Sequence, residues 1–287
     1  MRIDVLLLLF DRPEHSLQVV DSLVAAGVKE VRAFMDKSDR PDVLGRQAEL
    51  LGRLRERRDI HVDVVRQPHH LGLARSVKYA LDTSLAEADA AILLEDDCVL
   101  RPGAFEFFQQ GLTALRYDTR IRSLCGYLFP CPFVRSGTEP LLLRRFCTWG
   151  WATWRDRWAD FEPNLGRVVE RLAAQGVAVS DVADDLATLT SSNTYLEGRA
   201  DVWSLNWILE HYATKTFAVY PCDSMIENIG FDGSGKNCVP TSEFGTAPGA
   251  RIAEWRFSQL FHCTENEDML KAFMREHGLK TYPVEGS

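Results

Sequence analysis

The chain has 287 residues, of which 46% are hydrophobic and 26% charged, so it is long enough to bury a full hydrophobic core. Its formal net charge of −8 argues against nucleic acid as a partner, because nucleic-acid binders cluster lysine and arginine against the phosphate backbone. Seven scattered cysteines without a Cys-x-x-Cys pair make a zinc site or a disulfide framework unexpected.

The first ten residues, MRIDVLLLLF, form an apolar run that is too short to span a membrane. They also lack the small-residue cleavage site of a secretory signal. We therefore expect this run to be the first strand of a cytoplasmic protein without a transmembrane segment. Peripheral attachment at the inner face of a membrane requires no span and is compatible with this expectation.

The apolar residues of the first hundred positions alternate between strand-like and helix-like spacing. Strand-like runs cover residues 4–10, 30–36, 60–67 and 90–95. Helix-like spacing covers residues 12–27, 44–58 and 73–88. Strand, helix and strand in this order predict right-handed crossovers and a mostly parallel sheet with helices on both faces. The predicted fold class is therefore α/β.

Polar residues follow three of these predicted strands. They are Asp11 and Arg12 after the first strand, Asp36 after the second, and the triplet Glu95, Asp96 and Asp97 after the fourth. Open α/β sheets bind ligands at the carboxyl ends of their strands, so these side chains are expected to meet at one site. The glycine-rich dinucleotide and P-loop motifs are absent from the sequence.

The triplet Glu95-Asp96-Asp97 predicts a site for a cation. Three adjacent carboxylates repel one another, and burying them is costly unless a cation neutralises them. Mg²⁺ or Mn²⁺ commonly binds one or two protein carboxylates and leaves its other positions to water and substrate phosphates. The alternative interpretation is a solvated acidic turn after a strand. The preceding apolar run and the predicted topology favour a bound metal diphosphate.

The chain resembles GT-A-fold glycosyltransferases, in particular inverting N-acetylglucosaminyltransferase I-like enzymes and bacterial family 2-like sugar transferases. The stretches that carry the resemblance are LLLLFDRP, LGLARSVKYAL, LLEDDCVLRPGAFEFF, FCTWGWATWRDRW, DVWSLNW and ENIGFDGSG. The resemblance implies a Rossmann-like GT-A fold in a single catalytic domain, residues 1–287. Residues 1–100 would form the nucleotide-sugar-binding half, and residues 101–287 the acceptor-side half with the base and a lid loop.

The resemblance also implies roles for individual residues. Asp97 would bind the metal as the last acid of a DXD-type motif, and Asp96 would approach the ribose. The remaining residues expected at the nucleotide sugar are Phe10, Arg12, Asp36, Gly72, Arg75, Glu95, Trp149, Gly150, Trp151 and Lys236. The chemistry is consistent with these roles, because a carboxylate suits a ribose diol and an arginine suits a diphosphate.

An inverting displacement needs a base on the face of the sugar opposite the leaving group. Asp201 is the candidate, because the neighbouring Trp203 and Trp207 would partly desolvate its carboxylate and raise its basicity. The alternative is that Asp201 is an ordinary acidic residue in the first turn of a helix. Asp184 and Asp185 are competing acids, but their surroundings have the pattern of an exposed helix face.

Two stretches of the second half carry further expectations. FCTWGWATWRDRW holds four of the seven tryptophans, which fit either a core helix with an aromatic stripe or a sugar platform. NIGFDGSGKNC resembles the mobile loop that closes over the diphosphate and excludes water. Related bacterial sequences often carry a histidine in this loop, whereas this chain has Lys236 and Asn237. Lys236 is expected to contact the diphosphate.

The predicted function is metal-dependent transfer of a hexose or N-acetylhexosamine, with inversion, from a nucleotide sugar. The donor is expected to be a UDP-sugar, the cofactor Mn²⁺ or Mg²⁺, and the acceptor a hydroxyl of a glycan or glycoconjugate, as in surface polysaccharide biosynthesis. A sugar-phosphate nucleotidyltransferase and a catalytically inactive nucleotide-sugar-binding module are the alternatives, since an α/β fold does not itself imply activity.

Overall fold

The computed structural model describes residues 1–135, 137–183, 186, 203–234, 240–246 and 254–277. Eleven strands belong to these residues: β1 Ile3–Leu9, β2 Glu30–Met35, β3 His61–Arg66, β4 Ala90–Leu94, β5 Cys98–Leu100, β6 Ile121–Cys125, β7 Leu141–Leu143, β8 Trp151–Trp154, β9 Phe217–Tyr220, β10 Ile226–Asn228 and β11 Phe261–His262. The helices are α1 Pro13–Ala25, α2 Pro41–Glu56, α3 Gly72–Leu85, α4 Ala104–Ala114, α5 Arg155–Ala159, α6 Leu165–Ala174, α7 Val179–Val182, α10 Trp203–Ala213 and α11 Thr264–His277.

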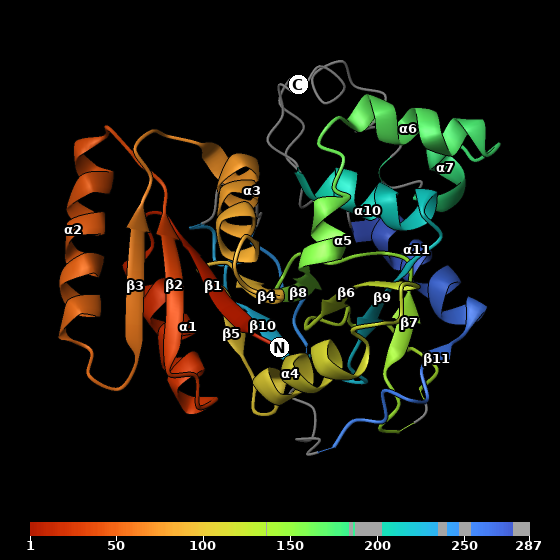
Figure 1. Ribbon diagram of the computed structural model, residues 1–287, viewed down its shortest axis with the longest axis horizontal. Coiled ribbons are helices and arrows are strands. Elements are labelled where there is room, and N and C mark those ends of the chain that lie inside the picture. The colour runs from red at the N-terminus through yellow and green to blue at the C-terminus, as the bar shows by residue number, and fades with distance from the viewer. Residues whose placement is uncertain (136, 184–185, 187–202, 235–239, 247–253, 278–287) are drawn as a thin grey trace.

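A nine-stranded sheet in the order β11-β7-β9-β6-β8-β4-β1-β2-β3 forms the centre of the fold (Figure 1). The pairs β1–β2, β2–β3, β1–β4, β6–β9 and β7–β11 are parallel. The pairs β4–β8, β6–β8 and β7–β9 are antiparallel. The predicted fold class, α/β with a mostly parallel central sheet flanked by helices, is therefore confirmed, with an antiparallel strand β8 inserted at its middle.

The central strands β1 and β4 are buried because helices and neighbouring strands cover them. All five residues of β4 are buried, and so are the last five of β1. Such strands have continuous apolar runs instead of alternating ones. α1 starts directly after β1, where Pro13 occupies its first turn and needs no hydrogen-bond partner for its nitrogen. The side chain of Arg12 is thus fixed at the junction of a buried strand and a helix.

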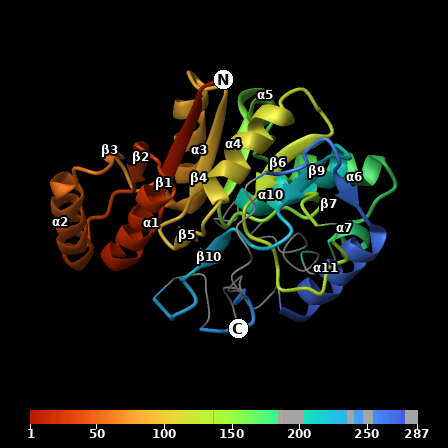
Figure 2. The same cartoon turned by 90° about the horizontal axis from the view of Figure 1, so that it is seen from below.

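The strand β5 leaves the large sheet and pairs antiparallel with β10, so that Asn228 lies opposite Cys98. In Figure 2, β5 and β10 lie side by side at the edge where β1 and β4 end. β9 belongs to the large sheet and β10 to the small one, although only five residues separate them in the chain. This division brings the segment after β10 to the carboxylates that follow β4.

The tryptophan-rich stretch is a strand and a short helix, which corrects the helical interpretation of its spacing. Trp151 and Trp154 belong to β8, and Trp158 belongs to α5. All three are buried in the core. No helix in the described part of the chain is both long enough and apolar enough to cross a membrane.

Candidate active site

The carboxylates Glu95, Asp96 and Asp97 occupy the turn between β4 and β5. β4 pairs in parallel with β1, with Leu94 beside Leu7, so the segment that follows β1 ends at the same edge of the sheet. Asp96 and Asp97 are buried, and Glu95 is partly buried. The triplet therefore lies in the fold where the strand pattern predicted it.

Arg12 bonds two of these carboxylates at once. Its Nη2 donates to Asp97 Oδ2 at 2.8 Å and also contacts Asp96 Oδ1, while its Nε donates to Asp96 Oδ2 at 3.2 Å. Burial opposes the charged guanidinium, but the attraction of Asp96 and Asp97 raises its pKa above the ordinary value. Arg12 is therefore a fixed positive charge in direct contact with the acidic turn.

One arginine does not neutralise three carboxylates. Burial, together with the charges of Asp97 and Asp96, raises the pKa of Glu95 to about 8. Burial also raises the pKa of Asp96 to about 6, although Arg12 works in the opposite direction. Burial is the main cause of both shifts, so holding these carboxyls in the ionised form is costly unless positive charge compensates them.

The segment after β10 forms a second wall of the site. Ile229 donates its backbone N–H to the Asp97 carbonyl at 3.0 Å, and Gly230 follows. A Cβ added to Gly230 would lie 2.9 Å from Asp97 Cγ, even closer to Oδ2, and 3.1 Å from Arg12 Nη1. Because real Cβ atoms do not approach other atoms this closely, any other residue here would force the Asp97 or Arg12 side chain to move. The glycine-rich stretch that contains Gly230 was its only signal in the sequence.

A second pair joins this segment to α1. His15 Nε2 lies 3.0 Å from Asp232 Oδ2, and the positive charge of a protonated His15 would act on Asp96. Neither residue was among those predicted for the site. The histidine lies three positions after Arg12, on the first turn of α1, so its spacing on a helix that starts at the site was the available signal.

Asp36 lies at the end of β2 and holds the start of α3. Its carboxylate accepts backbone N–H groups from Leu71 at 2.8 Å and from Gly72 at 2.9 Å. His70 Nδ1 lies 2.8 Å from the same carboxylate. The buried amide of Gln47 donates to the carbonyls of Asp36 and Phe10. These bonds connect the ends of β1 and β2 with α3.

The other residues of the first half that were predicted to contact the nucleotide sugar lie around the bonds made by Asp36. Phe10 lies 6.0 Å from the His70 ring, measured between ring centroids. Arg75 is exposed and donates from Nε to the Leu71 carbonyl at 2.7 Å. Phe10, Gly72 and Arg75 are thus near Asp36, which is a different part of the strand-end edge from the acidic turn.

Trp149 and Gly150 lie beside the segment that follows β10. The Trp149 ring contacts Phe231 at 5.2 Å and Tyr127 at 4.6 Å between centroids, and it is partly buried. Gly150 has φ +64°, and a Cβ there would lie 2.7 Å from Ile226 side-chain atoms. Trp151, by contrast, is fully buried and stacks on Trp203, so it lies in the core instead of presenting a face to a ligand.

Two predicted residues, Asp201 and Lys236, lie outside the described residues, as do the competing acids Asp184 and Asp185. The described part of α10 starts at Trp203, two positions after Asp201. Trp203 and Trp207 are both buried, which agrees with an apolar neighbourhood at this end of the helix.

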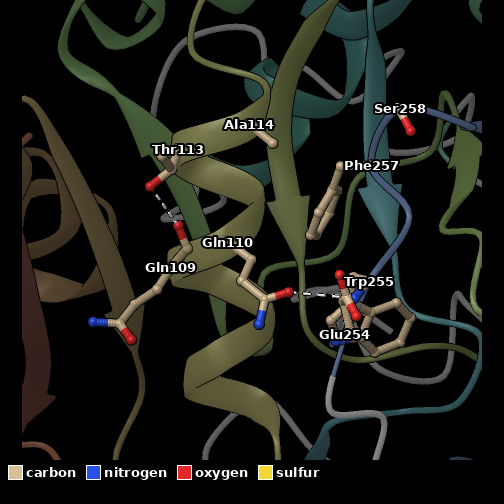
Figure 3. A pocket seen from close by; sticks show the side chains of 8 residues that line it. All are labelled: Gln109, Gln110, Thr113, Ala114, Glu254, Trp255, Phe257 and Ser258. Atoms are coloured by element: carbon tan, nitrogen blue, oxygen red, sulfur yellow. Dashed lines mark hydrogen bonds between the residues drawn. The ribbon is translucent and has the colours of Figure 1, made fainter.

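A pocket of about 650 Å³ lies away from the carboxylates, between α4 and residues 254–258 (Figure 3). Its lining residues are Gln109, Gln110, Thr113, Ala114, Glu254, Trp255, Phe257 and Ser258. None of the predicted site residues belongs to this lining. The pocket is wide open to solvent, and the Gln110 side chain accepts the Trp255 backbone N–H at 3.3 Å across one of its sides.

No protein-family model and no curated protein matches this sequence. Among solved structures, S. aureus TarS 1-349 is similar with a TM-score of 0.43 and 10% identity, over 79% of this chain and 59% of that chain. The mannosyltransferase PcManGT from Pyrobaculum calidifontis, in complex with GDP-Man and Mn²⁺, is similar with a TM-score of 0.40 and 14% identity, over 81% and 58%. UDP-glucose pyrophosphorylase from Acinetobacter baumanii has a TM-score of 0.39 and 11% identity, over 77% and 86%.

This chain therefore has structural similarity to a glycosyltransferase and to a sugar nucleotidyltransferase, and it spans less than two thirds of the first two proteins. Similarities with TM-scores below 0.5 do not distinguish between these activities.

Proposed function

We propose that this chain is a metal-dependent inverting glycosyltransferase that moves a hexose or N-acetylhexosamine from a UDP-sugar to a glycan hydroxyl. The observation that carries the proposal is the buried turn Glu95-Asp96-Asp97 at the carboxyl end of β4, in contact with Arg12 at the end of β1. Carboxylates and an arginine at the same edge of a sheet suit a metal diphosphate.

No group of three or more His, Cys, Asp or Glu side chains in the described residues is arranged as a metal site. The carboxylates of the turn nevertheless offer hard oxygen donors, which Mg²⁺ and Mn²⁺ prefer. The guanidinium of Arg12 already lies on Asp97, so a positive charge is accommodated there. Asp97 would hold the metal, which when bound would neutralise the charge that develops on the leaving nucleoside diphosphate.

The surrounding residues would bind and orient the donor. Asp96 would face the ribose, and Arg12 together with Lys236 would bind the diphosphate oxygens. Phe10, Gly72 and Arg75 lie around Asp36, where the base of the nucleotide would fit. Trp149 and Gly150 would lie beside the sugar, and Trp151 would support them from the core.

Asp201 would take the proton from the acceptor hydroxyl as that oxygen attacks the anomeric carbon. The proposal for Asp201 rests on its position in the sequence, two residues before the buried Trp203. The acceptor class, a glycan or glycoconjugate, rests on the family resemblance of the sequence.

Binding is tested by thermal stabilisation with a panel of nucleotide sugars, each with and without Mn²⁺. A ligand at about a hundred times its dissociation constant adds roughly 2.7 kcal/mol to the free energy of unfolding, which shifts the melting temperature measurably. We expect a UDP-sugar with Mn²⁺ to give the largest shift. Equal melting temperatures with all nucleotide sugars and with none would overturn the proposal.

Activity is tested by UDP release from the donor, with Asp97→Ala compared with wild type and with Asp63→Asn. Asp63 is an exposed carboxylate on the edge strand β3 and serves as the matched control. We expect release to be lost in Asp97→Ala and retained in the control. Formation of pyrophosphate from UTP and a sugar phosphate would identify the chain as a nucleotidyltransferase instead, and binding without turnover would identify it as a binding module.

A further inference from the structure

The carboxylate of Asp36 is fully occupied by contacts within the protein. Its Oδ1 accepts the backbone N–H groups of Lys37 and Leu71, both at 2.8 Å. Its Oδ2 accepts the N–H of Gly72 at 2.9 Å and lies 2.8 Å from Nδ1 of His70. An ionised carboxylate offers about four acceptor positions, so these four contacts use all of them. A nucleobase at the end of β2 must therefore be recognised by another group.

The same contacts determine which nitrogen of His70 carries the proton. Nδ1 lies 2.8 Å from Asp36 Oδ2 and 3.0 Å from the Lys37 carbonyl oxygen, and both oxygens are acceptors. Nδ1 must therefore carry a hydrogen, so Nε2 of the neutral imidazole is an acceptor. Within the described part of the chain, Nε2 has no hydrogen-bond partner. The side chain is 58% exposed, so this acceptor is available to a ligand.

The backbone around His70 is held at both ends. Gln67 donates its N–H to the Met35 carbonyl at 3.0 Å, and its side-chain oxygen accepts the Ser76 hydroxyl at 3.2 Å. The two residues that follow His70 donate their N–H groups to Asp36. The imidazole is consequently oriented before a ligand binds, which reduces the entropy that binding costs.

His70 and the acidic turn lie at the same edge of the sheet, two strands apart. β2 and β4 both pair with β1, so their ends are roughly 10 Å apart, because neighbouring strands are separated by about 4.8 Å. A nucleotide with its phosphates near Arg12 would extend its base in this direction. The Phe10 ring lies 6.0 Å from the imidazole between centroids and is tilted by 35°, so it offers an aromatic neighbour to a planar base.

We propose, on the basis of the proposed function, that His70 selects uracil as the base of the donor nucleotide. Its Nε2 accepts the hydrogen bond from the N3–H group of uracil. Cytosine has an acceptor at N3, so a cytidine nucleotide would leave both acceptors unpaired, at a cost in affinity. Asp36 is a positioning residue in this arrangement, because its bond to Nδ1 keeps the acceptor on Nε2.

The test measures dissociation constants of UDP, CDP and 3-methyl-UDP by isothermal titration calorimetry with Mn²⁺ present, for wild type, His70→Asn and His69→Asn. The amide of His70→Asn keeps a donor near the position of Nδ1 but has no acceptor at the position of Nε2. His69, an exposed histidine one position earlier, is the matched control.

Wild type should bind UDP at least roughly tenfold more tightly than CDP, and more tightly than 3-methyl-UDP by a similar factor, because a methyl group replaces the N3 donor in the latter. His70→Asn should bind the three nucleotides within about threefold of one another. His69→Asn should follow wild type. His70→Gln, whose amide oxygen can reach the position of Nε2, should retain part of the preference for UDP.

Equal affinities of wild type for UDP and 3-methyl-UDP would overturn the role of His70, and that comparison depends on no variant. An unchanged preference for UDP in His70→Asn would overturn it as well, and far-ultraviolet circular dichroism checks that this variant folds. Failure of wild type to bind any of the three nucleotides would instead refute the proposed function.

Discussion

Gly230 packs directly against the carboxylate of Asp97, although the two residues lie far apart in the sequence. The contact exists because β10 pairs with β5 and places Asn228 opposite Cys98. The segment that follows β10 is thereby attached to the candidate metal ligand.

This contact predicts that Gly230→Ala damages the site. The new methyl group would force Asp97 or Arg12 to move. We therefore expect the affinity for UDP in the presence of Mn²⁺ to fall at least roughly tenfold, which corresponds to a loss of about 1.4 kcal/mol or more in binding free energy. The measurement is thermal shift against UDP concentration. The control is Gly52→Ala in α2, where a Cβ meets nothing within 4 Å and alanine favours the helix. Unchanged affinity in Gly230→Ala would contradict the prediction.

Asp36 is expected to stabilise the fold whether or not it also contacts a nucleotide. Asp36→Ala would leave the N–H groups of Leu71 and Gly72 without their acceptor, at a cost of about 1 to 3 kcal/mol in the free energy of unfolding. Urea denaturation measures this cost. Asp39→Ala, which removes an exposed carboxylate three residues later, should change the stability by well under 1 kcal/mol. Equal stabilities of the two variants would show that the buried bonds contribute little.

The buried ion pair between Arg122 and Glu210 predicts strong non-additivity. Arg122 Nη2 donates to Glu210 Oε2 at 2.5 Å, and burial is the main cause that lowers the pKa of Arg122 and raises that of Glu210. Glu210→Leu alone would leave a buried arginine with a lost partner and is expected to cost about 3 to 5 kcal/mol.

The double variant Arg122→Met with Glu210→Leu should cost clearly less than the sum of the two single variants, because it leaves no unpaired charge at this pair. Denaturant titration of wild type, both single variants and the double variant gives the free energy of interaction between the two side chains. Arg120→Met, at an exposed residue two positions away, is the control and should cost less than about 1 kcal/mol. Additive costs would mean that the two side chains do not interact.

Glu267 on α11 predicts a dependence of stability on pH. Burial raises its pKa to about 7, and its carboxylate accepts the Arg144 backbone N–H at 2.6 Å. The folded state therefore holds a proton on Glu267 that the unfolded state has already released above its ordinary pKa of 4.5. The contribution of this group to stability consequently falls as the pH rises from about 4.5 to about 7.

Glu267→Gln removes this titration, so relative to wild type it should gain stability between pH 5 and pH 8, by on the order of 3 kcal/mol at most. Urea midpoints at several pH values measure the difference. Glu276→Gln, an exposed position on the same helix, is the control and should follow wild type throughout. A constant difference between wild type and Glu267→Gln across this range would contradict the assignment of a raised pKa.

Much of the first half was predictable because its elements are encoded locally. The runs 4–10, 30–36, 60–67 and 90–95 correspond to β1, β2, β3 and β4 within one or two residues. Buried parallel strands are apolar throughout, and the helices between them repeat their apolar residues every three or four positions. The position of the acidic turn at the end of β4 follows from the same pattern. Its predicted roles, and the single-domain organisation, remain predictions.

The second half depended on pairings that no local pattern contains. β8 joins the sheet in antiparallel orientation between β4 and β6, which buries Trp151 in the core. A single strand sequence gives no information about its partner, because that choice depends on what the rest of the chain can cover. The separation of β9 from β10 into different sheets depends on such pairing for the same reason.

By itself, the sequence determined the order of strands and helices in residues 1–100 and the placement of three carboxylates after the fourth strand, since both follow from the spacing of apolar and polar residues along the chain. Only the tertiary structure decided which groups face those carboxylates. Arg12 and Gly230 reach the turn through strand pairing and helix packing. Such contacts between distant segments are selected by the burial of the whole core rather than by any neighbouring residue.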